Sequence, residues 1–221
     1  MLKRALAALA ASLFLSSICL AQDSRFDFSM NANAVFTKQS SGNGITQTAT
    51  DGWGGFGSIR ARFNPKHSVV FSYGRAKNSQ LYQTVDTFHI LDNISEYSFA
   101  YMFTPMTKGH WEPFLVGGVG ALRFSPRTEW IFLPPLPGNV PDNIQVNLPA
   151  AKQTQLAFVY GGGVDYRLPV FSRFAIRLQY RGFIYKAPDF KIDASSGSNL
   201  SFFTGARGHM AEPSIGLVFR F

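Results

Sequence analysis

The sequence has almost no cysteine. Its one cysteine, Cys19, lies in an N-terminal segment that we expect to be removed. The mature chain would then form neither a disulfide nor a cysteine-ligated metal site. Long apolar runs are also missing, because no hydrophobic stretch of ~20 residues occurs after that segment. The 20 glycines and 12 prolines interrupt most helical windows. The sequence after that segment therefore fits a barrel better than a helical membrane protein, and helices of any kind should be few.

A concentrated block of charge is missing too. Removing Lys3 and Arg4 lowers the basic count from 21 to 19, which leaves a formal charge of +6 against 13 acidic residues. The arginines and lysines are scattered and form no stripe or basic helix, so we expect no nucleic-acid partner. A basic surplus that faces lipid phosphates is more plausible. About 200 residues without a linker or low-complexity segment predict one domain.

The first 21 residues have the pattern of a secretory signal peptide. Lys3 and Arg4 precede an apolar core over residues 5–20, and Cys19-Leu20-Ala21 resembles a small-x-small cleavage site. We expect cleavage before Gln22 and a single domain over residues 22–221. A retained anchor and a lipoprotein modified at Cys19 are the alternatives.

The end of the sequence alternates with a period of two. Over residues 211–221 one face carries Ile215, Leu217, Phe219 and Phe221, and the opposite face carries mostly polar or small residues. Such alternation predicts a strand between two environments, and eleven residues suffice for a tilted strand that crosses a membrane.

The same alternation recurs seven more times along the chain, which predicts eight antiparallel strands. The expected strands are residues 25–37, 53–63, 68–76, 94–103, 113–124, 155–168, 173–185 and 211–221. The connections after strands two, four and six are short, and those after strands one, three, five and seven are long. Short turns at one end and long loops at the other are typical of an up-and-down transmembrane β-barrel of the outer membrane.

Each predicted strand has an apolar face and a face that holds its charges. An arginine facing lipid at mid-membrane costs roughly 2–4 kcal/mol, so the charged faces should line the lumen. On residues 113–124 we expect Phe114, Leu122 and Phe124 to point outward. Because an eight-stranded barrel is filled by side chains, the acids should pair with arginines in an interior polar network. Its expected members are Arg60, Arg62, Glu96, Arg123, Asp165, Arg177, Arg181, Glu212 and Arg220.

The last eight residues, Ser214-Ile215-Gly216-Leu217-Val218-Phe219-Arg220-Phe221, carry a specific motif. A polar residue, a glycine two positions later and aromatics at the third-last and last positions resemble the assembly signal of the small outer-membrane barrels of the OmpA/OmpX type. The resemblance covers nearly the whole mature chain in pattern. It implies recognition by the barrel assembly machinery, which would read Gly216, Phe219 and Phe221. The eight strands themselves place both termini at the short-turn end, which we expect to be periplasmic.

Two further features bear on function. Trp130, Ile131, Phe132 and Leu133 form an apolar run in the longest loop. The run predicts a contact surface for a ligand or partner, or else a segment that extends a hairpin above the membrane or folds over the mouth of the barrel. His209 with Glu212 and a serine of residues 195–201 is the one constellation that suggests catalysis. No set of histidines has the spacing of a metal site.

The sequence thus predicts a monomeric outer-membrane barrel with a structural, adhesive or surface-interaction role and no cofactor. Its expected partners are outer-membrane lipid and lipopolysaccharide, and the assembly machinery during biogenesis. The alternatives are a lipid-modifying membrane enzyme, a soluble exported barrel with an apolar ligand inside, and a narrow anion-selective pore.

Overall fold

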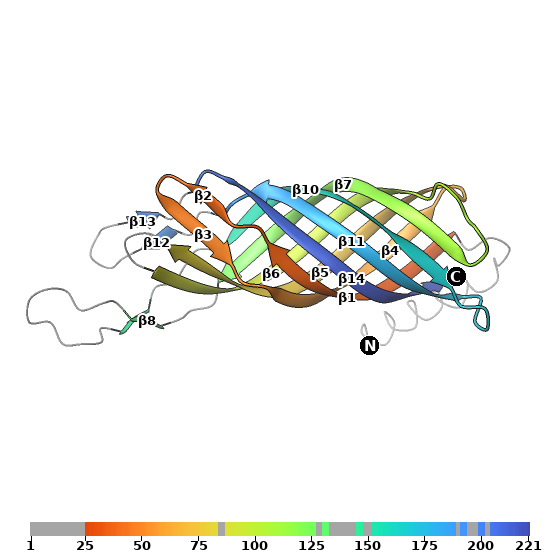
Figure 1. Cartoon of the computed structure of the whole chain (residues 1–221), viewed down its shortest axis with the longest axis horizontal. Coiled ribbons are helices and arrows are strands. Elements are labelled where there is room, and N and C mark those ends of the chain that lie inside the picture. Colours follow the sequence, from red (N-terminus) through yellow and green to blue (C-terminus); the bar gives the residue numbers. More distant parts are fainter. Residues whose placement is uncertain are drawn as a thin grey trace, which may run out of the picture.

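The protein is described from a computed structural model (Figure 1). The structure describes residues 25–83, 87–126, 130–132, 145–147, 152–188, 191–193, 199–201 and 204–221. Within these ranges every regular element is a strand. The described residues include no helix that is both long and apolar enough to cross a membrane.

Eight long antiparallel strands form a closed ring. Its order around the ring is β1, β4, β5, β6, β7, β10, β11 and β14. The bounds are β1 Phe26–Thr37, β4 Gly52–Arg62, β5 His67–Gln83, β6 Thr87–Phe103, β7 Trp111–Pro126, β10 Gln153–Arg167, β11 Phe174–Lys186 and β14 Arg207–Arg220. The last strand closes on the first, with Phe28 opposite Phe219. The predicted eight-stranded up-and-down barrel is confirmed.

The two ends of the barrel differ. Short connections over residues 63–66, 104–110 and 168–173 join strands at one end, called the turn end here, where the C-terminus also lies (Figure 1). At the opposite, loop end three of the four connections carry short strands of their own. These are β2 Ser40–Gly42, β3 Ile45–Ala49, β8 Trp130–Phe132, β9 Gln145–Asn147, β12 Lys191–Asp193 and β13 Asn199–Ser201.

One long connection proves to be mostly strand. A loop was expected over residues 77–93, but β5 and β6 stay paired as far as Gln83 opposite Thr87. The extension carries polar residues on both faces, such as Lys77, Asn78 and Asn93. Hydrogen bonding between strands continues there after the apolar alternation has ended, so the pattern could not reveal it.

Along the strands, exposed apolar residues alternate with buried polar ones, which is the reverse of the pattern in a soluble protein. Phe71, Phe99 and Leu178 point outward and are 49%, 56% and 50% exposed, whereas Arg60 and Arg177 point inward and are 2% and 1% exposed. This arrangement is incompatible with the soluble alternative, which requires the apolar faces inside.

The strand β7 departs from the expected orientation. Phe114, Leu122 and Phe124 are at most 2% exposed and point into the lumen, while Leu115 and Val119 point outward. Both faces of β7 are apolar, so alternation alone could not tell them apart. Glycine makes room for the inward ring, since a Cβ on Gly163 of β10 would lie 2.7 Å from Cζ of Phe114.

Candidate functional site

The lumen near the turn end holds a group of buried ion pairs centred on Asp165, which is 0% exposed. Arg177 donates Nε–H to Oδ1 at 2.7 Å and a second N–H to Oδ2 at 2.8 Å. Arg60 donates to the same Oδ2 from 3.2 Å. Such a two-pronged contact is the strong geometry for an arginine and a carboxylate. The strands β10 and β11 bring it about, because their register sets Asp165 directly opposite Arg177.

Two further acids complete this group. Asp27 accepts from Nε of Arg60 at 2.9 and 2.7 Å and from Arg62 at 3.0 Å. Glu112 accepts from Arg220 at 2.6 and 3.1 Å and also from Arg167. We call these residues the turn-end cluster; its members are Asp27, Arg60, Arg62, Glu112, Asp165, Arg167, Arg177 and Arg220.

Sequence reasoning missed three members of the turn-end cluster. Asp27 lies on the polar face of β1 with Ser29 and Asn31, so its alternation was a sufficient signal. Glu112 was missed because β7 was assigned the opposite orientation, although its register partner is the inward Asp165. Arg167 follows Asp165 by two residues and shares its face.

A second buried group crosses the middle of the lumen. One guanidinium nitrogen of Arg181 donates to Glu96 at 2.8 Å and to Glu212 at 2.5 Å. The guanidinium carbon lies 3.5 Å from the ring centre of Phe56, which is a favourable cation–π position. We call Glu96, Arg181 and Glu212 the central triad, and Phe56 packs against its guanidinium group. The triad blocks the lumen with a side chain from β11 that contacts β4, β6 and β14.

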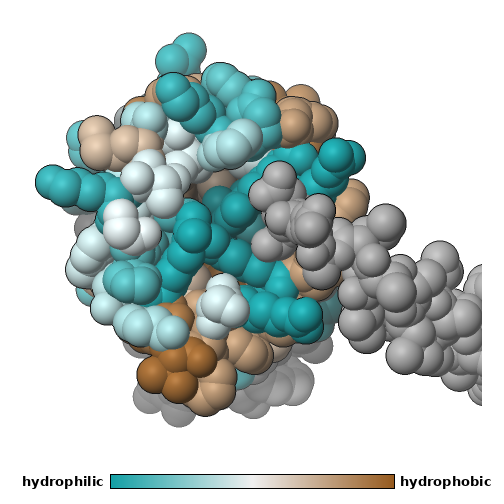
Figure 2. All heavy atoms as spheres, turned by 90° about the vertical axis from the view of Figure 1, so that its right-hand side faces the viewer, coloured by the Kyte–Doolittle hydropathy of each residue, from teal (hydrophilic) through white to brown (hydrophobic). Residues whose placement is uncertain are grey.

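Beyond the central triad, toward the loop end, the lumen is lined by apolar side chains. Phe183 and Met210 are opposite each other on β11 and β14, and Ile94 faces Phe124 across β6 and β7. All four are at most 1% exposed. The buried ion pairs therefore lie in the turn-end half and at the central triad. An apolar layer follows toward the loop end, and Asn78 and Asp92 are buried beyond it. Figure 2, which looks onto the turn end, shows hydrophilic residues across that face and hydrophobic residues toward its edge.

Eight of the nine residues predicted for the interior network lie in the lumen. Arg60, Glu96, Asp165, Arg177, Arg181, Glu212 and Arg220 are buried in the lumen, and Arg62 joins them with a side chain that is 20% exposed. The expectation for Arg123 is wrong. Its side chain is exposed and points outward from β7, opposite Thr154 of β10. This follows from the reversed orientation of β7, since the residues on either side of Arg123 are the buried Leu122 and Phe124.

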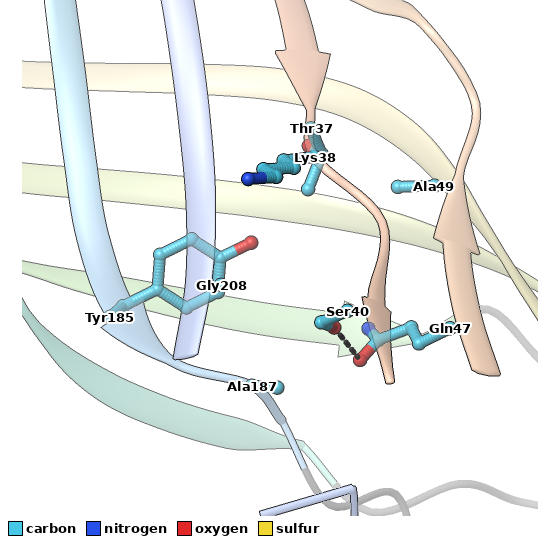
Figure 3. A pocket seen from close by; sticks show the side chains of 8 residues that line it. All are labelled: Thr37, Lys38, Ser40, Gln47, Ala49, Tyr185, Ala187 and Gly208. Carbon is cyan, nitrogen blue, oxygen red and sulfur yellow. Dashed lines mark hydrogen bonds between the residues drawn. The ribbon is translucent and has the colours of Figure 1, made fainter. Parts of the chain in front are cut away.

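A small polar recess lies at the loop end, between the β2–β3 hairpin and the ends of β11 and β14 (Figure 3). Ser40 donates a hydrogen bond to Gln47 at 3.4 Å across the hairpin. The ring of Tyr185 enters the recess over Gly208. A Cβ on Gly208 would lie 2.7 Å from Cζ of Tyr185. The recess has no space for a water-sized molecule, so it serves packing of the hairpin rather than ligand binding.

The candidate loop surface is only partly described. Trp130, Ile131 and Phe132 form β8, which pairs with β9. Leu133 lies outside the described residues. The structure shows the backbone pairing of these two short strands, and whether this segment is a contact surface or a hairpin stays a prediction.

The candidate assembly residues lie at the seam between β14 and β1. Phe219 and Phe221 point outward with ring centres 5.9 Å apart, and Phe221 also stacks on Phe26 at 6.5 Å. Gly216 points inward against Asn31. A Cβ there would overlap Oδ1 of Asn31 and the carbonyl oxygen of Met30. The fold itself thus requires glycine at this position.

The structure does not bring the candidate catalytic residues His209 and Glu212 together. His209 lies on the outward face of β14, where its Nε2 is 2.6 Å from the hydroxyl of Tyr160. Glu212 lies on the inward face and contacts Arg181. Two residues on opposite faces of one strand cannot act on one proton. Among the described residues no group of three or more metal-ligating side chains occurs.

Solved structures share this fold. The chain is 18% identical to the Neisserial surface protein A, with a TM-score of 0.51 over 88% of this chain and 97% of that one. It is 13% identical to the outer membrane protein OprG from Pseudomonas aeruginosa, with a TM-score of 0.56 over 89% and 95%. It is 15% identical to the outer membrane protein AlkL, with a TM-score of 0.50 over 91% and 92%.

These structural similarities show that the chain has the fold of the small outer-membrane barrels. No protein-family model matches the sequence, and no curated protein matches it.

Proposed function

We propose that the protein is a sealed barrel of the bacterial outer membrane that acts through its outer surface and its loop end. The apolar outward faces would contact lipid, the turn end and both termini would lie in the periplasm, and the loops would reach the cell surface. The role is structural, adhesive or another surface interaction. The short turns and long loops support this orientation, which is the usual one for such barrels.

The filled lumen is the observation that carries the proposal. Arg181 spans the cavity between Glu96 and Glu212, the turn-end cluster fills one side of it, and buried Phe124 and Phe183 fill the other. A solute would have to displace buried ion pairs and then cross an apolar layer. Both steps are costly, so the proposal excludes the anion-selective pore.

Conductance tests this proposal directly. The purified barrel, reconstituted into a planar lipid bilayer, should show no stable single-channel current, because no aqueous path crosses the central triad. A general porin in the same bilayer provides the positive control. Carbonate extraction of membranes and a mobility change on boiling would show that the barrel is inserted and folded. Stable anion-selective steps from such folded protein would contradict the proposal.

Biogenesis adds a second part to the proposal. The assembly machinery would read Gly216, Phe219 and Phe221 during insertion, and the mature barrel would act as a monomer surrounded by outer-membrane lipid and lipopolysaccharide. The outward aromatic pair at the end of β14 supports a recognition role. The contact of Gly216 with Asn31 adds a packing role in the folded barrel.

Comparing refolding in detergent with assembly in cells distinguishes the packing role of Gly216 from the recognition role of the terminal aromatic residues. Gly216→Ala should lower the free energy of unfolding in detergent by about 1–3 kcal/mol, because the added methyl group meets Asn31 and backbone. Gly117→Ala is the matched control, since a Cβ there meets nothing within 4 Å. Phe221→Ala should refold nearly as the unmodified protein does but accumulate poorly in the outer membrane.

Urea unfolding in detergent and membrane fractionation provide the two measurements. Unchanged stability of Gly216→Ala would refute the packing role. Normal accumulation of Phe221→Ala in membranes would refute recognition of the terminal aromatic.

A further inference from the structure

Two polar side chains are buried inside the barrel at its loop end, beyond the apolar layer. Asp92 of β6 is 2% exposed and Asn78 of β5 is 5% exposed. The two residues lie directly opposite each other in the β5–β6 ladder. Side chains in such positions share one face of the sheet and have Cβ atoms about 4.5–5.5 Å apart. The ladder therefore brings a carboxylate and an amide together in the interior.

The carboxylate of Asp92 has no cation to balance it. Among the described residues, neither of its oxygens accepts a hydrogen bond and no ion pair includes it. The backbone N–H groups of Asn93 and Ser125 lie near it, but they carry no net charge. Arg181 is bound to Glu96, which is four residues, or about 13 Å, away along β6. A buried carboxylate without a counter-charge is costly, so a cation is needed here.

The side chain of Asn78 offers a further oxygen. Its Nδ2–H group donates a hydrogen bond to Oγ1 of Thr37 at 3.2 Å, which uses the amide nitrogen. Its Oδ1 is buried and accepts no hydrogen bond from the described part of the chain. Two carboxylate oxygens and one amide oxygen on the same interior face thus lack partners.

This set of oxygens suits a hard cation. Ca²⁺ binds carboxylate and amide oxygens at about 2.3–2.6 Å in a flexible geometry and accepts water as an additional ligand. Mg²⁺ requires a nearly octahedral arrangement and gives up its water reluctantly, and Zn²⁺ favours nitrogen and sulfur ligands. Affinity for Ca²⁺ follows the number of charged ligands, so one carboxylate predicts a weak site with a Kd of about 1 mM.

We propose that Asp92 and Asn78 bind a Ca²⁺ ion inside the loop end of the barrel. Asp92 contacts the ion with its carboxylate and Asn78 contacts it with Oδ1, while water completes the coordination. The ion supplies the positive charge that the surrounding side chains do not, and it links β5 to β6 above the apolar layer. The fold alone forms this site, so the proposal does not depend on the orientation of the barrel in a membrane.

Thermal unfolding of the full-length folded barrel in detergent tests the proposal, with the mobility of unboiled samples as the readout. Changing from a chelator to about 10 mM CaCl₂ should raise the Tm of the unmodified protein by about 2–4 °C. Asp92→Asn should lose this response, and in the chelator it should unfold at no lower temperature than the unmodified protein, because the uncompensated charge is gone. Asp51→Asn is the matched control, since it removes an exposed charge at the same end and should keep the full response.

A second variant should strengthen the site. Asn78→Asp adds a second carboxylate, so it should bind Ca²⁺ about tenfold more tightly and should be less stable than the unmodified protein in the chelator. Asn93→Asp is its control, because the same charge is then added to the opposite face of β6, and the affinity should change less than about twofold. Calorimetric titration gives the affinity and should count one ion per barrel.

An equal Ca²⁺ response in Asp92→Asn and in the unmodified protein would overturn the proposal, because the ion would then bind elsewhere. No response in the unmodified protein would overturn it as well; that result is expected if the amide of Asn78 donates to Asp92 and the two side chains satisfy each other. Mg²⁺ at the same concentration should produce a smaller shift in Tm. An equal shift would indicate a general ionic effect and would also contradict the proposed site.

Discussion

Replacing Asp165 with asparagine is expected to lower the free energy of unfolding by about 3–5 kcal/mol, the usual cost of removing one partner of a buried ion pair. Asp165 is fully buried and accepts hydrogen bonds from Arg177 and Arg60, with Arg220 at 3.7 Å. The amide keeps the size of the side chain but removes its charge. The turn-end cluster holds five arginines against three acids, and three of these arginines are as deeply buried as the acids. The variant therefore leaves a buried guanidinium charge without its counter-charge.

The measurement is urea unfolding of the barrel in phospholipid vesicles, followed by tryptophan fluorescence and by the mobility of unboiled samples. Asp51→Asn is the matched control, because Asp51 is exposed beside β4, and its stability should stay within about 0.5 kcal/mol of the unmodified protein. A similarly small change for Asp165→Asn would mean that Asp165 is not the electrostatic centre of the cluster.

The fold could be read from the sequence wherever one face of a strand is polar and the other apolar. On β1, β4, β11 and β14 this contrast is strong, and Arg60, Arg177 and Arg181 are found in the lumen. On β7 it is absent, because lipid outside and an apolar layer inside select the same residue types. The sequence pattern therefore carried no information about the orientation of Arg123, which only the pairing of β7 with β6 and β10 determines.

The alternation predicts which face of the sheet a residue lies on, but it does not predict the residue with which it pairs. Asp165 and Arg177 are joined by one short turn, so counting residues back from the turn would have paired them. Glu96 and Arg181 are 85 residues apart and belong to strands that are not neighbours in the ring. Their contact depends on the diameter of the closed barrel and on the strand stagger, which no local pattern specifies.

A change in the central triad should have an effect of similar size to that at Asp165. Arg181→Met removes the one cation that Glu96 and Glu212 share in the central triad. Both of these acids are at most 2% exposed. Two acids without a counter-charge would then face each other in the buried interior of the barrel. We expect a loss of about 3–5 kcal/mol, measured by urea unfolding in the same vesicles.

A triple variant separates the charge from the packing. Arg181→Met combined with Glu96→Leu and Glu212→Leu replaces the whole triad by apolar side chains beside Phe56 and Phe183. Replacing a complete buried ionic group in this way is often neutral or stabilising, so stability should return to within about 1 kcal/mol of the unmodified protein. If the triple variant is as unstable as Arg181→Met alone, then the barrel depends on the packing of the guanidinium against Phe56, and the compensation of the two acids contributes little.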